Sequence, residues 1–151
     1  MSDERKPRTG AVVVGVSPTS GSPAALRWGA DEARRRGADL VALSAWRPPR
    51  PPIAPGGRPP GVSYESGDAV GEARERLADQ IRAALGDSVD VFTEIIHGST
   101  FRALLQASET AELLVLDAPS RLDLPEGPTL ARRLIYAAEC PVVIMPPKTL
   151  D

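Results

Sequence analysis

The chain has few of the residues that build disulfide frameworks and metal sites. Among its 151 residues there is one cysteine, Cys140, and one histidine, His97. A single cysteine excludes an intrachain disulfide, and one histidine with no paired cysteine is a poor metal ligand set. No apolar run approaches the roughly 20 residues that a transmembrane helix needs. We therefore expect no metal site and no membrane partner.

A strong net charge is also missing. Acidic and basic residues nearly balance, with a net charge of -2, so nothing favours general binding to nucleic acid or to anionic lipid. The charged N-terminus lacks the apolar stretch of a signal peptide. The low cysteine content fits a reducing compartment. We expect a cytoplasmic protein with no nucleic-acid partner.

The sequence does contain a regular alternation of apolar runs and amphipathic segments. The runs lie at residues 11–16, 40–45, 89–96, 113–116 and 142–145. The helical segments between them carry start and stop signals, such as Ser22-Pro23 and Gly37 around the first. The second is predicted to begin at Asp68, and Ser99 and Thr129 are predicted to cap the third and the fourth. The fourth is predicted to bury Leu130, Leu134 and Ala137. This order predicts an α/β fold with a parallel sheet and helices on both faces. Ligands of such sheets bind beyond the carboxyl ends of the strands.

We interpret residues 1–151 as a single domain, since a chain of this length most simply forms one core. Residues 47–66 hold much of the proline and glycine of the chain. Consecutive prolines favour extended backbone and cannot pair as a central strand. The segment is predicted to be a long surface loop within the domain.

Six short segments match the local sequences of one known family. They are Ala11–Ser17 (AVVVGVS), Ala24–Ala30 (AALRWGA), Arg34–Leu40 (RRRGADL), Ile96–Gly98 (IHG), Ala111–Leu116 (AELLVL) and Ala138–Pro146 (AECPVVIMP). These segments give most of the chain a resemblance to the universal stress protein family. It implies a Rossmann-like fold, similar to the adenine nucleotide alpha hydrolases, with an open five-stranded sheet in the order 3-2-1-4-5.

The resemblance also implies homodimers, often made by pairing the fifth strands. The residues that would form this edge strand are Val142, Val143, Ile144 and Met145. An uncovered apolar edge strand invites pairing with another chain, and a two-fold axis satisfies both edges at once. We expect a homodimer through the last strand.

Family members that bind ATP carry Gly-x2-Gly-x9-Gly-(Ser/Thr) between the fourth strand and the fourth helix. They also carry an acidic residue just after the first strand, near the adenosine. In this chain the motif positions fall on Asp117, Ser120, Pro128 and Thr129, and the spacer is two residues short. The acidic position is Ser17. All three glycines are replaced, and the final hydroxyl alone matches.

The replaced glycines predict a site that binds phosphate poorly. Glycines let phosphate oxygens reach backbone N–H groups, whereas this loop holds the prolines and acids Pro119, Pro125, Pro128, Asp117, Asp123 and Glu126. One carboxylate about 5 Å from one phosphate charge costs roughly 3 kcal/mol at an effective dielectric near 20, or about a hundredfold in affinity. We expect ATP binding to be lost or very weak, and no cofactor. The alternative is ATP with Mg²⁺ bridging Asp117 to phosphate.

Other candidate residues favour structural roles. The loop Ser17–Ser22 lacks the lysine and the spacing of a P-loop, although the following helix N-terminus could hold an anion. His97 and Cys140 have no catalytic partners in the local sequence, and Trp28 and Trp46 are interpreted as packing residues. We therefore predict no catalytic residues.

Three functions remain open, and the first is favoured. The favoured one is a non-catalytic dimer that regulates a stress response through an unknown protein partner. The second is a member that binds ATP, AMP or a cyclic nucleotide through Ser17, Thr129 and backbone groups. The third is a metal-assisted nucleotide hydrolase that uses Asp117.

Overall fold

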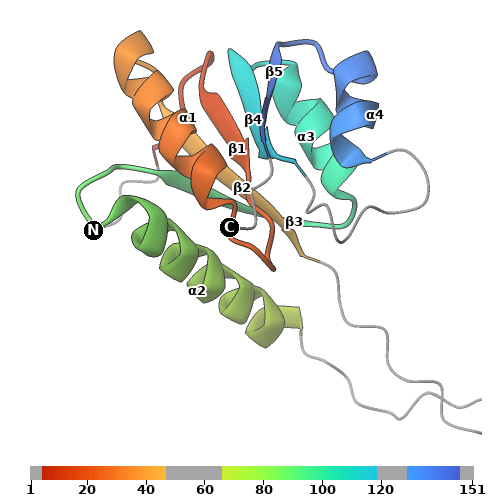
Figure 1. Cartoon of the computed structure of the whole chain (residues 1–151). Helices are drawn as coiled ribbons and strands as arrows, with labels where there is room; N and C mark the ends of the chain where they lie inside the picture. Colours follow the sequence, from red (N-terminus) through yellow and green to blue (C-terminus); the bar gives the residue numbers. More distant parts are fainter. Residues whose placement is uncertain (1–4, 47–65, 119–128, 147–151) are drawn as a thin grey trace, which may run out of the picture.

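The computed structural model describes residues 5–46, 66–118 and 129–146, with the side chains of residues 66–68 excepted. Strands and helices alternate along the chain (Figure 1). The elements are β1 (Val12–Gly15), α1 (Pro23–Arg36), β2 (Leu40–Trp46), α2 (Ser66–Leu85), β3 (Phe92–His97), α3 (Thr100–Ser108), β4 (Leu113–Asp117), α4 (Leu130–Ala137) and β5 (Val142–Met145).

The five strands form one sheet in the order β3-β2-β1-β4-β5. Every neighbouring pair is parallel; β1, for example, pairs with β2 on one side and with β4 on the other. The predicted fold class and strand order are confirmed. The chain reverses its direction of travel across the sheet between β1 and β4, so the loops after these two strands meet at the usual ligand-binding end of an open sheet.

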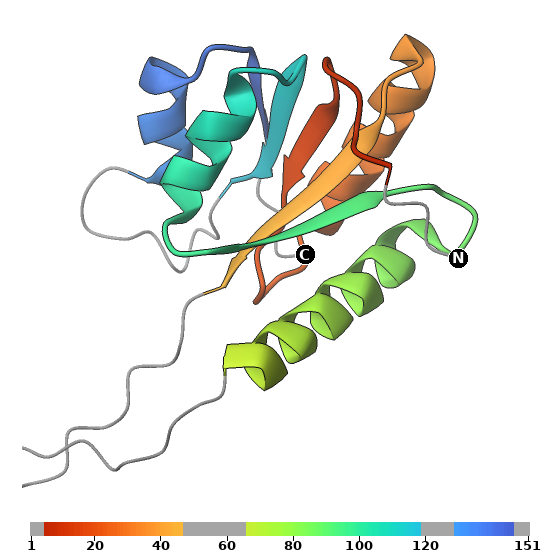
Figure 2. The same cartoon turned by 180° about the vertical axis from the view of Figure 1, so that it is seen from behind.

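Helices α1 and α2 cover one face of the sheet, and α3 and α4 cover the other (Figures 1 and 2). The alternation of side chains along β1 divides the core between the two faces. Val12 and Val14 pack with residues of α1 and α2, such as Leu26 and Leu77. Val13 packs on the opposite face with a cluster that includes Leu104 and Leu134. The apolar runs of the sequence are therefore strands buried on both faces.

Several predicted boundaries differ from the structure. Strand β3 begins at Phe92 and not at the predicted Val89. Val89 lies in the preceding loop and is 38% exposed. Helix α2 begins at Ser66, two residues before the predicted start at Asp68. Ala137, predicted to face the core, is exposed. The proline-rich segment lies outside the described residues, apart from Ser66.

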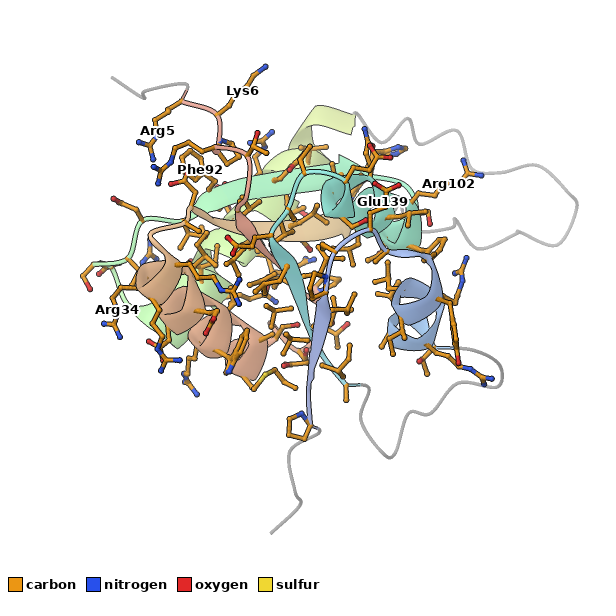
Figure 3. The ribbon with its side chains drawn as sticks, turned by 90° about the horizontal axis from the view of Figure 1, so that it is seen from above. Arg5, Lys6, Arg34, Phe92, Arg102 and Glu139 are labelled. Carbon is orange, nitrogen blue, oxygen red and sulfur yellow. The ribbon has the colours of Figure 1, made fainter. Side chains whose placement is uncertain are left out.

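An ion-pair cluster ties the segment before β1 to the start of β2. Arg8 donates to both carboxylate oxygens of Asp39, and its backbone N–H donates to Oδ2 at 2.8 Å. Arg5 also reaches Asp39 and lies over the ring of Phe92, 5.3 Å from its centroid (Figure 3). The Asp39 side chain is 8% exposed. This carboxylate therefore anchors the N-terminal segment.

Asp39 should contribute an acid-sensitive part of the stability. Hydrogen bonds from the Arg8 side chain and backbone hold the pKa of Asp39 below its ordinary value, against an opposing effect of desolvation. A carboxyl whose folded pKa is lowered stabilises the protein above its unfolded pKa of about 4, and this stability is lost as the pH falls further. Asp39→Asn should therefore lower the urea midpoint at pH 7 and flatten its decline between pH 5 and pH 3. An unchanged decline would contradict this assignment.

Candidate functional site

The loop after β1 closes on itself through serine hydroxyls. Ser17 Oγ accepts hydrogen bonds from the N–H groups of Thr19 and Ser20, at 3.3 and 3.4 Å. The Ser17 N–H donates to Ser22 Oγ at 3.0 Å, and the Gly21 N–H donates to the Ser17 carbonyl at 2.9 Å. Ser17, predicted to lie near an adenosine, is thus already engaged in hydrogen bonds within its own loop.

Helix α2 holds this loop from the side. Gln80 Nε2 donates to the carbonyl of Pro18 at 3.0 Å and to that of Ser17 at 3.4 Å. Gly21 has a φ of 77° and lies against the Gln80 side chain, where an added Cβ would be 3.2 Å from Gln80 Cγ. This contact could not be predicted, because Gln80 is distant in the chain from Ser17 and Pro18 and belongs to no recognised motif.

Asp117 reaches from the end of β4 to the start of α1. Its Oδ1 accepts a hydrogen bond from the Ala25 N–H at 3.0 Å. Leu113 and Val115 share a face of β4 and pack in the core beneath α1, and strand alternation places Asp117 on that same face. The carboxylate expected to repel phosphate, or to hold Mg²⁺, is therefore hydrogen-bonded to a helix N-terminus.

Thr129 is the N-cap of α4. Its Oγ1 accepts a hydrogen bond from the Arg132 N–H at 3.2 Å, which satisfies one of the free donors of the first helical turn. Ser99 caps α3 in the same way, with the Arg102 N–H as donor. Both caps were predicted from the sequence and are confirmed. Ser120 lies outside the described residues, so the structure brings together Ser17 and Asp117 near α1 but does not place the whole motif.

An aromatic pair lies at the carboxyl ends of β2 and β3. The rings of Trp46 and His97 are 5.0 Å apart and tilted by 43°. They are register partners in the paired strands, and the Gly98 N–H donates to the Trp46 carbonyl at 3.1 Å. His97 is exposed. The pairing was missed because each ring was considered alone, although both residues end neighbouring strands.

Cys140 lies just before β5 and packs against the α3 and α4 side of the core. It is half-buried. Burial raises the pKa of the Cys140 thiol, and a hydrogen bond with the Leu114 backbone opposes this shift in part. A thiol with a raised pKa is a poor nucleophile at neutral pH. Within the described residues no group of three or more His, Cys, Asp or Glu could hold a metal ion.

The two edges of the sheet differ in character. Strand β5 consists of Val142, Val143, Ile144 and Met145, all half-buried, and has no charged residue. Strand β3, at the other edge, exposes Thr93, Glu94 and His97. Charged and polar side chains on an edge discourage pairing with another chain. The β5 edge carries no such protection in its own side chains.

Comparison with known proteins gives a consistent result. The model of the Universal stress protein family matches residues 9–146. Universal stress protein Rv1996 of Mycobacterium tuberculosis is 30% identical over 145 residues, which cover 92% of this chain and 44% of the relative. Universal stress protein Rv2624c of the same organism is 28% identical over 147 residues, 96% of this chain and 51% of the relative. The chain thus spans about half the length of the curated relatives it matches.

Solved structures of low identity share the fold. UspA from Lactobacillus plantarum has a TM-score of 0.67 at 18% identity, covering 93% of this chain and 99% of its own. A universal stress protein in complex with cAMP has a TM-score of 0.58 at 19% identity and covers 93% and 98%. The Archaeoglobus fulgidus protein in complex with dAMP has a TM-score of 0.58 at 21% identity and covers 89% and 96%. In the part of this chain that the structure describes, no helix is long and apolar enough to cross a membrane.

Proposed function

Because the chain belongs to the universal stress protein family, we propose that it is a non-catalytic regulatory dimer of the stress response whose ATP site is lost or very weak. The protein acts in the cytoplasm through a protein partner and uses no cofactor. The observation that carries this proposal is the closed state of the loop after β1. Its serine groups bond to one another, and α2 fixes its carbonyls.

A nucleotide would have to compete with these contacts. Ser17 and Ser22 would exchange internal hydrogen bonds for bonds to a ligand, which brings little net gain. The third helical N–H of α1 is already bonded to Asp117. That carboxylate stands at the first glycine position of the family motif and would repel a phosphate placed beside it. These features together favour the loss of ATP binding.

A second candidate function is supported by the relatives in complex with cAMP and dAMP. In this reading the chain binds an adenine nucleotide through Ser17, Thr129 and backbone groups. The hydroxyl of Thr129 accepts a hydrogen bond as the cap of α4 and still has a proton to donate. A metal-assisted hydrolase that uses Asp117 with Mg²⁺ is less well supported, because Asp117 already accepts a hydrogen bond from α1.

Calorimetric titration of the native chain with Mg-ATP tests the proposal. We expect no saturable heat at ligand concentrations up to the low millimolar range. A motif-restored variant carries Asp117→Gly, Ser120→Gly, Pro128→Gly and two added spacer residues, so that it has the family motif again. Its affinity should exceed that of the native chain by roughly a hundredfold or more, because a repelling carboxylate is removed and backbone donors are returned.

The same titration with cAMP and AMP addresses the second candidate. Micromolar binding of any adenine nucleotide by the native chain would overturn the proposed loss of the site. Mg²⁺-dependent phosphate release that disappears in Asp117→Asn would favour the hydrolase instead. Stability of the motif-restored variant should be checked by urea unfolding, so that a lack of binding is not confused with a lack of folding.

A further inference from the structure

Helix α1 begins without a cap from its own N-cap residue. Ser22 occupies that position but makes no side-chain capping bond, and it lies in the left-handed region with φ of 45°. It is the one non-glycine residue with positive φ in the described parts of the chain. Its Oγ instead accepts from the Ser17 N–H. The Ser22 side chain therefore accepts a hydrogen bond from the loop after β1 and not from the first turn of the helix, as an N-cap side chain normally does.

The first turn of α1 offers few backbone donors and no negative charge of its own. Pro23 has no N–H, and the Leu26 N–H donates to the Ser22 carbonyl at 3.0 Å. No acidic residue lies in the first turn, although a carboxylate is favourable there because of the helix dipole. The Ala25 N–H, which an N-cap side chain usually accepts from, donates to Asp117 Oδ1.

The backbone of Asp117 is held in place on the other side. Asp117 pairs with Met145 of β5, and the following Ala118 N–H donates to the Met145 carbonyl at 2.8 Å. Leu116 is buried in the core on the opposite face of the sheet. The carboxylate is thus presented to α1 from a strand end that pairs with β5 and follows a buried residue. This arrangement joins two segments that lie 92 positions apart in the sequence.

We propose that Asp117 is the N-cap of α1, supplied from β4, and that this contact keeps the β1 and β4 end of the sheet closed without any bound ligand. The inference rests on the proposed function, because the bond between Asp117 and Ala25 is a contact of the same site that a substitution can remove. The carboxylate serves the helix in place of Ser22, and the serine is thereby free to close the loop. Asp117 is a positioning residue, with no part in a reaction.

The test combines unfolding with amide exchange. Asp117→Ala should raise the unfolding equilibrium constant about tenfold, the usual effect of losing a cap. The exchange rate of the Ala25 amide, followed by NMR in the folded protein, should rise by at least as much. Asp117→Asn keeps an oxygen acceptor but loses the charge, so its effects should be smaller. Asp31→Ala, which removes an exposed carboxylate from the same helix, should change neither quantity.

A double-mutant cycle separates the cap from other effects of Asp117. Ala25→Pro removes the donor N–H while keeping a φ compatible with the first helical turn. In that background, Asp117→Ala should raise the unfolding constant by a clearly smaller factor than it does in the native chain. An equal effect with and without Ala25→Pro, or an Ala25 amide unaffected by Asp117→Ala, would overturn the proposal. No nucleotide enters this experiment, so its failure would leave the proposed loss of ATP binding standing, and the reverse also holds.

Discussion

Replacing Ile135 by lysine should leave the fold intact and separate the proposed dimer into monomers. Ile135 is 57% exposed on α4, so a lysine there costs the isolated chain little. A two-fold axis places the change in both subunits. A central apolar contact contributes roughly 2 kcal/mol in each copy, so the dissociation constant should rise by about a thousandfold.

Helical geometry places Ile135 toward the β5 edge of the sheet. Leu134 is fully buried and marks the inner face of α4. Arg133 and Ile135 lie about 100° to either side of it. Arg133 faces α3, because its guanidinium lies 4.0 Å from the ring centroid of Phe101. Ile135 therefore lies on the flank that faces away from α3, toward the outer edge of β5, where no further strand pairs among the described residues.

The backbone of β5 supports pairing at the same edge. The carbonyls of Pro141 and Met145 accept hydrogen bonds from the β4 side. Because successive residues of a strand direct their N–H and C=O groups to opposite sides, Val142 and Ile144 direct theirs outward. A four-residue strand covers only about 13 Å of edge. Apolar contacts from the α4 flank would supply area that a stable dimer needs beyond this short ladder.

Sedimentation equilibrium of the native chain and the Ile135→Lys variant measures the effect. Val89→Lys is the matched control, since Val89 is also an exposed apolar residue but lies before β3. We expect Val89→Lys to dimerise as the native chain does. A native chain that stays monomeric at tens of micromolar, or a variant that dimerises as tightly as the native chain, would refute this interface.

The parallel sheet and the two-faced core could be predicted because they depend on local pattern, whereas the strand order 3-2-1-4-5 was predicted from the family resemblance. Continuous β-branched runs such as Val12–Gly15 are typical of strands buried on both faces, and the alternating helices require parallel strands. Capping residues Ser99 and Thr129 were also predictable, because a cap depends on neighbours in the sequence. These features are set by interactions over a few residues.

The contacts of the candidate site depend on tertiary placement and were not predicted. Sequence reasoning treated Asp117 as a negative charge against phosphate, whereas the structure shows it bonded to the Ala25 N–H. The alternation of Leu113, Val115 and Asp117 on one face was a usable signal. No sequence signal indicated the contact between Gln80 and Pro18, because it joins a helix to a loop that is distant in the sequence. Ser22 was correctly predicted as the N-cap position, but its side chain serves the loop instead.

Two helical glycines should respond in opposite ways to alanine, and the difference measures how closely α1 approaches the sheet. Gly29 lies on the buried face of α1, where an added Cβ would be 2.6 Å from Val14 Cγ2. Gly71 in α2 has nothing within 4 Å of such a Cβ. Through backbone entropy alone, each change to alanine raises the free energy of unfolding by about 0.5–1 kcal/mol, because alanine has a lower backbone entropy than glycine in the unfolded chain. Comparison of the two therefore isolates the packing cost at Gly29.

That cost should be substantial, because the neighbour cannot move aside. Val14 is fully buried, and a β-branched side chain has little rotamer freedom. Overpacking of this kind typically costs about 1–3 kcal/mol, so Gly29→Ala should be less stable than Gly71→Ala by that amount. Urea unfolding with unchanged m-values measures the difference. Equal stabilisation by both alanines would mean that α1 can lift from β1 at no cost, and a helix so loosely seated could not hold its N-terminus against Asp117.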